Sequence, residues 1–399
     1  CAKDVLSFED SISVVKMSLT LSGIKTTWQP KNNLIEFFFN HCLFYLEVFW
    51  LQSEIVSEIY WIIDGAKQGK SIIELAVITP CVFGSYMINF KAYSLYSKRT
   101  TLNEVFSKLE EIHPKFKDME FQKEKRVVLE FQKLLKLVVR VLLSSTIFVF
   151  VAYTFLPVQS MFSEYKRNGE IKLELPFLVK FFFNPMTTVL YPIVYLHQVI
   201  ATLFVCINLL ASETTYFALC TSMTMHFKLL SYQIEDITLS PHNNARQNQM
   251  LAAVTKRHHD LIKLTNDVEA LYSKSNLGHI LISSILICLS GFIIAFNNDY
   301  GAIFTYVFFL ISILSQVFLL CYFGDMLIQA SSEISDAVYR SLWYNADKRS
   351  KKSLYFILMR AQIPCKLTAA GFGDINLITF TTILSRSWSY FAMLQTMFD

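Results

Sequence analysis

The sequence predicts an all-α integral membrane protein with seven transmembrane helices, a cytoplasmic N-terminus and an extracellular C-terminus. Of its 399 residues, 53% are apolar and 35 are Phe, and the mean hydropathy is +0.39, which is more apolar surface than one soluble core hides. Only 11 Gly and 9 Pro occur, which favours long helices over a barrel. Seven apolar stretches alternate with polar segments of very unequal basic charge.

Basic residues give the predicted helices their direction. Of the 36 Lys and Arg residues, 28 fall in four polar segments: residues 1–33, 91–136, 217–276 and 327–370. Short cytoplasmic loops carry the excess of Lys and Arg, so we expect these segments inside the cell. After an odd number of crossings the C-terminus is outside, which is the reverse of a G-protein-coupled receptor. The net charge of +4 follows from the same loops and does not indicate nucleic-acid binding.

Five apolar stretches predict the second to sixth spans, because a helix needs about 20 mostly apolar residues to cross a membrane. Residues 75–90 form the second. Residues 141–157 form the third and follow Arg140, whose long side chain can reach the inner interface. The last three contain no Asp, Glu, Lys or Arg: residues 181–212, 275–298 and 300–324.

The first and seventh spans are less apolar. Residues 34–51 contain Glu36 and Glu47, and residues 375–398 contain Arg386. A charge at the centre of a membrane helix costs about 2.5–3.5 kcal/mol on insertion scales. We therefore expect these three side chains to face protein or water rather than lipid.

The cytoplasmic segments are expected to be helical and to pack together between subunits. Apolar residues recur at three- and four-residue steps in 250–271, which predicts an amphipathic helix. The sixth span continues as a helix through 326–342, and a short helix over 354–359 ends before Pro364.

The chain contains one weak enzyme motif. His113 and Asp118 have the H-x4-D spacing of membrane acyltransferases, in which the acid orients a catalytic base. A chance match in a charged loop is the simpler explanation, because no partner motif follows. His258 and His259 do not predict a metal site, since adjacent residues on a helix point about 100° apart. We expect no cofactor and no metal.

One face of the seventh span combines polar residues with a large flexible thioether. Arg386, Ser389 or Tyr390, Met393 and Thr396 recur at three- and four-residue steps and so share a helix face. One interpretation is a pore lining in which Met393 forms a hydrophobic constriction. The other is a stripe of helix–helix contact, and the spacing does not decide between them.

Aromatic and polar residues gather in the outer halves of several spans. Such a mixture suits a small apolar ligand pocket with a few polar groups. Aromatic packing between helices is the more common explanation, so the pocket is a hypothesis. Its candidate residues are Phe83, Tyr86, Met87, Phe148, Ala152, Tyr153, Tyr195, Gln198, Phe304 and Tyr306.

The C-terminal third resembles the insect odorant receptor family over roughly 80 residues. A segment from Tyr195 to Gln198, with Glu213 and His226, is also similar to that family's fourth span. The matching C-terminal residues are Cys321-Tyr322-Phe323-Gly324-Asp325, Ala337, Tyr339, Trp343-Tyr344, Met359-Arg360-Ala361-Gln362-Ile363-Pro364, Leu367-Thr368-Ala369-Ala370-Gly371, Phe380, Leu384 and Ser389-Tyr390-Phe391.

This resemblance implies an odorant-tuning subunit of a ligand-gated, non-selective cation channel, a heterotetramer with a shared co-receptor in the plasma membrane of a sensory dendrite. It implies a small hydrophobic volatile bound in the outer half of the bundle, and Met393 at the gate with Thr396 beside it. The resemblance divides the chain into a cytoplasmic arm (1–33), a ligand-binding bundle (34–326), cytoplasmic anchor helices (327–370) and a pore-lining span (371–399).

Two alternatives stay open at this stage. Gustatory receptors are related channels, but they close with Thr-Tyr, five apolar residues and Gln-Phe, whereas here Gln395 comes one place early and Thr396 follows. A membrane acyltransferase using His113 and Asp118 is the alternative from another class. The co-receptor itself has a large insertion before its fifth span, which this chain lacks.

Overall fold

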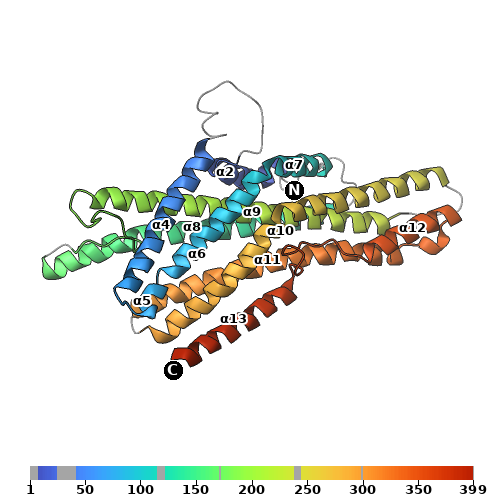
Figure 1. The fold of residues 1–399 in the computed structure, drawn as a ribbon. Helices are drawn as coiled ribbons and strands as arrows, with labels where there is room; N and C mark the ends of the chain where they lie inside the picture. The colour runs from blue at the N-terminus through green and yellow to red at the C-terminus, as the bar shows by residue number, and fades with distance from the viewer. Residues whose placement is uncertain are drawn as a thin grey trace, which may run out of the picture.

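The computed structural model describes residues 8–24, 42–114, 122–169, 172–237, 244–297 and 300–398, and these form an elongated bundle of helices (Figure 1). Within these ranges the one β-type pairing is an isolated bridge between Thr368 and Asp374. The predicted all-α class is confirmed. The helices are α1 (Phe8–Ser11), α2 (Ser13–Leu21), α4 (Leu43–Lys67), α5 (Ile72–Ala76), α6 (Thr79–Ser97), α7 (Arg99–Ile112), α8 (Gln122–Asn168), α9 (Tyr191–Glu235), α10 (Asn244–Phe296), α11 (Tyr300–Arg340), α12 (Lys348–Ala361) and α13 (Leu377–Phe398).

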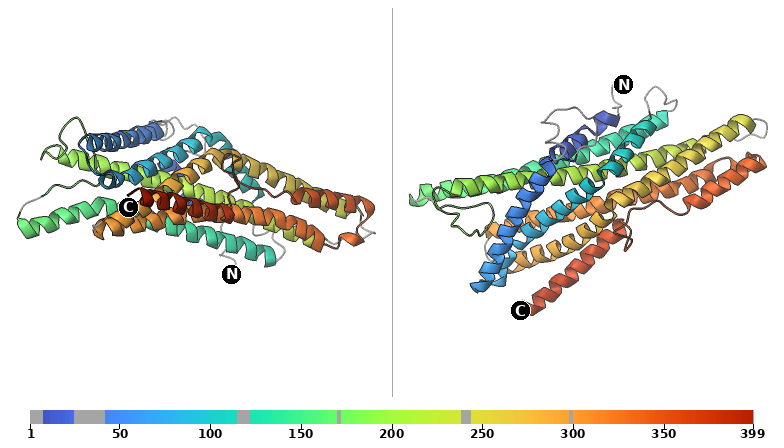
Figure 2. Two further views of the ribbon diagram at one scale, coloured as in Figure 1. Left: turned by 60° about the horizontal axis from the view of Figure 1, so that its bottom comes forward. Right: turned by 45° about the horizontal axis from the view of Figure 1, so that its top comes forward.

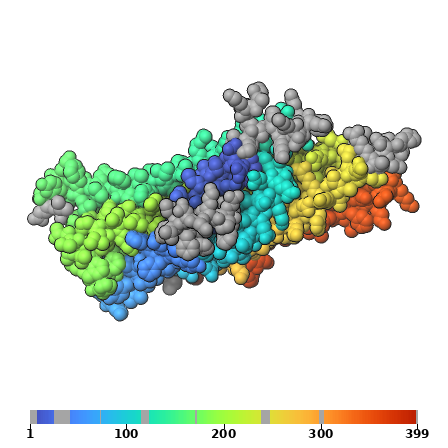
Figure 3. Space-filling view, turned by 90° about the horizontal axis from the view of Figure 1, so that it is seen from above, coloured from blue at the N-terminus to red at the C-terminus, as the bar shows by residue number. Residues whose placement is uncertain are grey.

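Helix α9 is the axis of the bundle. It packs against α2, α4, α6, α8, α10 and α11. Its middle section is buried all round from Ala211 to Phe227, so this part of the helix has no face left for solvent. Figure 3 shows the N-terminal helix α2 seated across the middle of the molecule, where Ser18 meets Thr214 of α9 at 3.5 Å.

Five described helical segments are long and apolar enough to cross a membrane: Glu74–Ser97, Lys123–Asn168, Tyr191–Glu235, Gln247–Phe296 and Ile303–Arg340. Each of them overlaps one of the predicted second to sixth spans. By this measure of length and composition, α4 and α13, which hold the described parts of the first and seventh, are not among them.

Two predicted boundaries were wrong. The first span was expected to end at Leu51, but α4 continues to Lys67 because its acidic residues find partners inside the bundle. The fourth span was expected from Phe181, but α9 begins at Tyr191, with Pro192 in its first turn. Residues 34–41 of the first predicted span lie outside the described ranges.

The helices predicted for the polar segments 250–271, 326–342 and 354–359 are present as parts of α10, α11 and α12. In α10 the periodic residues Leu261, Leu264, Val268 and Leu271 are buried. Helix α11 runs unbroken through the predicted domain boundary at residue 326. The N-cap of α12 is Asp347, whose side chain accepts from the Arg349 and Ser350 N–H groups. Figure 2 shows α12 folded back along the ends of α10 and α11, and α13 leaving the bundle toward the opposite end.

The segment between α12 and α13 is fixed to the bundle by side chains. The Ser331 hydroxyl accepts from the Cys365 N–H at 3.0 Å. The Glu269 carboxylate accepts from the backbone N–H of Thr368 at 2.7 Å and from its hydroxyl. Gly324 of α11 lies so close to this segment that a Cβ there would overlap the Ile375 carbonyl oxygen. Several residues of the C-terminal resemblance therefore fix the start of α13.

Candidate functional site

Three buried carboxylates share one face of α4. Glu47, Glu54 and Glu58 are spaced seven and four residues apart and are 1%, 5% and 2% exposed. Buried acids are costly unless they are hydrogen-bonded or paired. Asn208 of α9 donates to Glu47 at 2.9 Å. Among the described residues, one oxygen of Glu58 has no hydrogen-bond partner.

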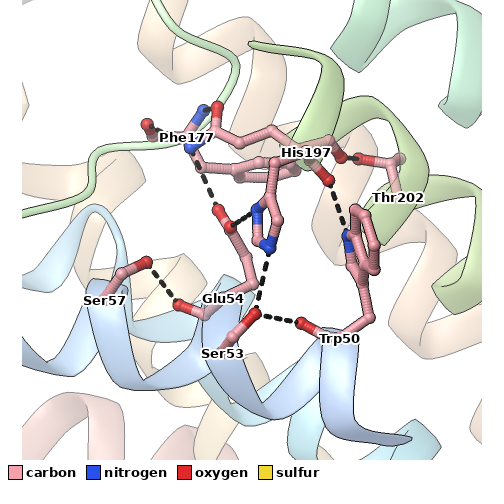
Figure 4. A network of polar contacts seen from close by, with 8 residues as sticks. Trp50, Ser53, Glu54, Ser57, Phe177, His197 and Thr202 are labelled. Atoms are coloured by element: carbon pink, nitrogen blue, oxygen red, sulfur yellow. Dashed lines mark hydrogen bonds and ion pairs between the residues drawn. The ribbon is translucent and has the colours of Figure 1, made fainter. Parts of the chain in front are cut away.

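Glu54 is the centre of a polar network between α4 and α9 (Figure 4). Its Oε2 lies 3.0 Å from His197 Nδ1, and the other ring nitrogen of His197 lies 3.0 Å from the Ser53 hydroxyl. The Trp50 indole stacks on the imidazole, with ring centroids 4.9 Å apart, and its N–H donates to the His197 carbonyl at 3.0 Å. Side chains of α4 thus lie within 3.0 Å of both ring nitrogens of His197.

Gln198 joins this network to the non-helical segment before α9. Its amide donates to Glu54 Oε1 at 3.0 Å and to the Phe177 carbonyl at 3.2 Å, and its oxygen accepts from the Phe177 N–H at 3.2 Å. The Gln198 side chain is completely buried. It therefore satisfies both backbone groups of Phe177, which is half-buried.

Aromatic residues complete the site. The Phe177 ring stacks on Tyr153 of α8 with centroids 5.2 Å apart and planes 17° apart. Tyr153 contacts Cys81 of α6 and lies near Tyr306 of α11 and Glu58. Residues from α6 and α8 and from the segment before α9 therefore meet at one tyrosine, with Tyr306 of α11 and Glu58 of α4 nearby.

The structure brings together some of the sequence-predicted pocket residues and separates others. Tyr153 and Tyr306 belong to the cluster, the Tyr306 hydroxyl donates to the Val77 carbonyl, and Tyr195 donates to the Thr154 carbonyl at 2.5 Å. Met87 is buried, and Phe83 and Ala152 are half-buried. Three candidates point away from the bundle in the single chain: Tyr86, Phe148 and Phe304.

Several residues of this site were missed by sequence reasoning. Glu54 and Glu58 follow Leu51, where the first span was expected to end, so they were assigned to a loop. The spacing of the three acids on one helix face was the available signal. Nothing in the local sequence marks Phe177, because its partners are 21 and 24 positions away.

The predicted gate face of α13 is exposed in the single chain. Ile383 and Ser387 are buried, and the Ser387 hydroxyl donates to the Ser284 carbonyl of α10 at 3.3 Å. The described residues leave the opposite side exposed, and Met393 there is 58% exposed. The other members of this exposed face are Arg386, Ser389, Tyr390 and Thr396.

A buried polar triad at the centre of the bundle was also missed. The Lys91 ammonium of α6 donates to Glu213 of α9 and lies 2.8 Å from His279 Nδ1 of α10. All three residues are buried. The triad joins the three helices. The sequence does not predict it, because Lys91 begins the basic segment 91–136 that is expected inside the cell.

The His113 ring packs against other rings of the protein. It lies 5.4 Å from Phe8 and 6.3 Å, edge-on, from His226. Burial lowers its pKa below the usual value. Asp118, the other half of the acyltransferase hypothesis, lies outside the described residues.

Comparison with known proteins gives one consistent result. The family model described as "7tm Odorant receptor" matches residues 72–387. Among curated proteins, Odorant receptor 67c of Drosophila melanogaster is 26% identical over 350 residues, covering 86% of this chain and 85% of its own. Odorant receptor 85b of the same species is 31% identical over 189 residues, or 47% of this chain and 48% of its own.

Solved structures share the fold. The insect olfactory receptor OR5 from Machilis hrabei, in complex with eugenol, has a TM-score of 0.83 and 18% identity and covers 98% of both chains. A second structure of the same receptor has a TM-score of 0.82 and 18% identity and covers 97% of both chains.

Proposed function

This chain belongs to the 7tm odorant receptor family, and from that premise we propose that it is the odorant-binding subunit of a ligand-gated, non-selective cation channel. It is a multi-pass membrane protein, with five described helices able to cross a membrane. The observation that carries the proposal is the family match over residues 72–387, which includes every helix of the cluster around Tyr153 except α4.

The proposed ligand is a small volatile molecule that is mostly apolar and carries at most a few polar groups. It would bind in the outer half of the bundle, near Tyr153 and Tyr306 and the other pocket residues predicted from the sequence. Aromatic walls with a few polar groups are the usual lining of a small-molecule site. The related receptor solved with eugenol makes a phenolic volatile a reasonable first probe.

The proposed pore is lined by α13, with Met393 as its constriction. Support comes from the division of this helix into a packed face and an exposed one, because Met393 is among the residues that the other described helices leave exposed. A methionine ring around a central axis would close the pore by excluding water. Ligand binding opens the pore only if the open arrangement binds the volatile more tightly.

Arg386 would lie further toward the cytoplasm on the same face. A cation near the axis disfavours cation flow unless it is paired or set back from the axis. We place it beside the inner, water-filled vestibule.

We propose that the channel is a heterotetramer with an odorant co-receptor in the plasma membrane, with the N-terminus inside and the C-terminus outside. The helices α10, α11 and α12 would form the cytoplasmic anchor between subunits. The basic residues of α12 support this side assignment. Tags at the two termini test it: in intact cells, antibody should reach the C-terminal tag and not the N-terminal one.

Expression with and without an insect odorant co-receptor tests the function. Whole-cell currents would be recorded during exposure to a panel of volatiles that includes eugenol. We expect an inward cation current for at least one volatile, and only when both subunits are present. Absence of any evoked current, with both subunits at the cell surface, would overturn the proposal.

A further inference from the structure

Residues 172–190 connect α8 to α9 as a non-helical strap that is tied to the bundle at several points. The Tyr191 hydroxyl donates to the Glu174 carbonyl at 2.7 Å. The Lys180 N–H donates to the Ser57 carbonyl at 3.1 Å, and the Lys180 ammonium lies 2.5 Å from Asp64 of α4. The strap is therefore fixed to both α4 and α9.

Phe177 is a further point at which the strap is tied to α9. It lies beside Gln198, seven residues into α9, which places it about 10 Å below the start of that helix. Backbone N–H and C=O groups at such a position need partners within the protein. The Gln198 amide supplies both, and Glu54 holds the same amide from the other side (Figure 4).

The Phe177 ring forms part of the aromatic cluster. It stacks on Tyr153, which contacts Cys81 and lies near Tyr306. Phe177 thus places a side chain from outside the helices against Tyr153 of α8, which contacts Cys81 of α6. A ring at this point limits the length and width of any ligand that lies against Tyr153.

Gln198 has a different part in the site. Both of its amide N–H groups and its oxygen are engaged by Glu54 and by the Phe177 backbone. It keeps no N–H group for a ligand. It can act on ligand choice only through the position that it gives to Phe177.

We infer that Phe177 is a ligand-selecting residue of the volatile pocket and that Gln198, oriented by Glu54, is the positioning residue that sets it in place. This inference rests on the proposed function. Selection would be steric, because one methylene in an apolar pocket changes discrimination by roughly 10- to 200-fold.

The test uses the full chain expressed with the co-receptor and a homologous series of straight-chain primary alcohols from butanol to decanol, together with eugenol. We expect Phe177→Ala to shift the preferred chain length upward, with at least a tenfold change in the ratio of half-maximal concentrations for a long and a short alcohol. Phe177→Leu should give a smaller shift in the same direction. Phe177→Leu also provides the test of selectivity if Phe177→Ala fails to reach the cell surface.

Phe182→Ala is the matched control. It removes the same ring from the same strap, but Phe182 is 96% exposed. We expect its concentration ratios to equal those of the wild type. Unchanged ratios in both Phe177 variants, with normal surface expression, would overturn the inference.

Gln198→Met keeps the volume and removes the hydrogen bonds. We expect it to shift chain-length preference in the same direction as Phe177→Ala, and we expect the double variant to shift no further than Phe177→Ala alone. If the shift of the double variant equals the sum of the two single shifts, Gln198 does not act through Phe177. That result would overturn the positioning role of Gln198.

The wild type separates the two levels of the proposal. If it gives no volatile-evoked current with the co-receptor, the proposed function fails and the inference fails with it. If it responds and the Phe177 variants keep its selectivity, only the inference fails.

Discussion

The Glu54 carboxylate of α4 lies 3.0 Å from the His197 imidazole of α9, and the same carboxylate accepts from Gln198 at 3.0 Å. One buried acid therefore holds two consecutive residues of α9. Through Gln198 it also holds the strap. The packing of α4 depends on this acid, which is why the helix continues past the point where its apolar run weakens.

Glu54→Ala should destabilise the protein strongly. The substitution removes the carboxylate beside His197 and one of the two acceptors of the Gln198 amide, at a cost of about 2 kcal/mol or more. Thermal unfolding of the detergent-solubilised protein measures the effect. Asp64→Ala on the same helix is the control, because its pair with Lys180 is partly exposed and contributes about 0–1 kcal/mol. Equal losses for the two variants would contradict the account.

Lys91→Met should cost more than the double variant Lys91→Met with Glu213→Gln. Removing one member of a buried ion pair costs about 3–5 kcal/mol, because the other charge is left uncompensated, whereas replacing both is often nearly neutral. Lys108→Met, which removes an exposed partner of Asp267, should have little effect. Unfolding midpoints for the three variants provide the comparison. A double variant as unstable as the single one would argue against a buried pair.

Gly324→Ala should prevent normal assembly of α13. The added methyl group overlaps the Ile375 carbonyl oxygen, which is backbone and has no rotamer to change. Gly84→Ala on α6 is the matched control, since a Cβ there meets nothing within 4 Å and alanine favours a helix by about 1 kcal/mol. Surface expression and melting temperature of both variants provide the measurement. Tolerance of Gly324→Ala would show that the close contact is not needed.

Stability should fall in acid partly through His113. Burial lowers the pKa of this residue in the folded state, so the unfolded chain binds a proton at a higher pH than the folded chain does. Its contribution is constant above the unfolded value of about 6.5 and declines as the pH falls below it. His113→Phe, which keeps a ring against Phe8, should flatten the dependence of melting temperature on pH between 5 and 6.5. An unchanged slope would exclude this contribution.

Met393→Ala should raise the resting current of the channel formed with the co-receptor. A smaller apolar side chain at the constriction admits water more readily and so weakens closure by dewetting. Basal and volatile-evoked currents would be compared at equal surface expression. Unchanged basal and evoked currents would remove Met393 from the gate.

Periodicity predicted the helices well where the apolar pattern was long. The 250–271 pattern placed Leu261 and Val268 in the core, and both are buried. Periodicity failed for α4, because the two acids Glu54 and Glu58 are polar and interrupt the apolar pattern. Only the structure shows that both are buried. Periodicity also failed for 181–190, where apolar composition was mistaken for helix.

The candidate site was harder to predict than the fold. Tyr153 and Gln198 were named from composition, but the sequence does not say that Gln198 is occupied by the backbone of Phe177. The contact joins a helix to a non-helical strap, which follows no period. The pairing of Glu54 with His197 is likewise a tertiary contact between residues far apart in the chain.

If this chain lines the pore of a volatile-gated channel, a Met393→Glu variant should change the ion selectivity of that channel. The reversal potential of the evoked current would be measured in sodium and in calcium solutions, with wild-type co-receptor throughout. A carboxylate at the constriction should raise calcium permeability relative to sodium and shift the calcium reversal potential to more positive values. An evoked current with unchanged reversal potentials in both solutions would contradict the claim.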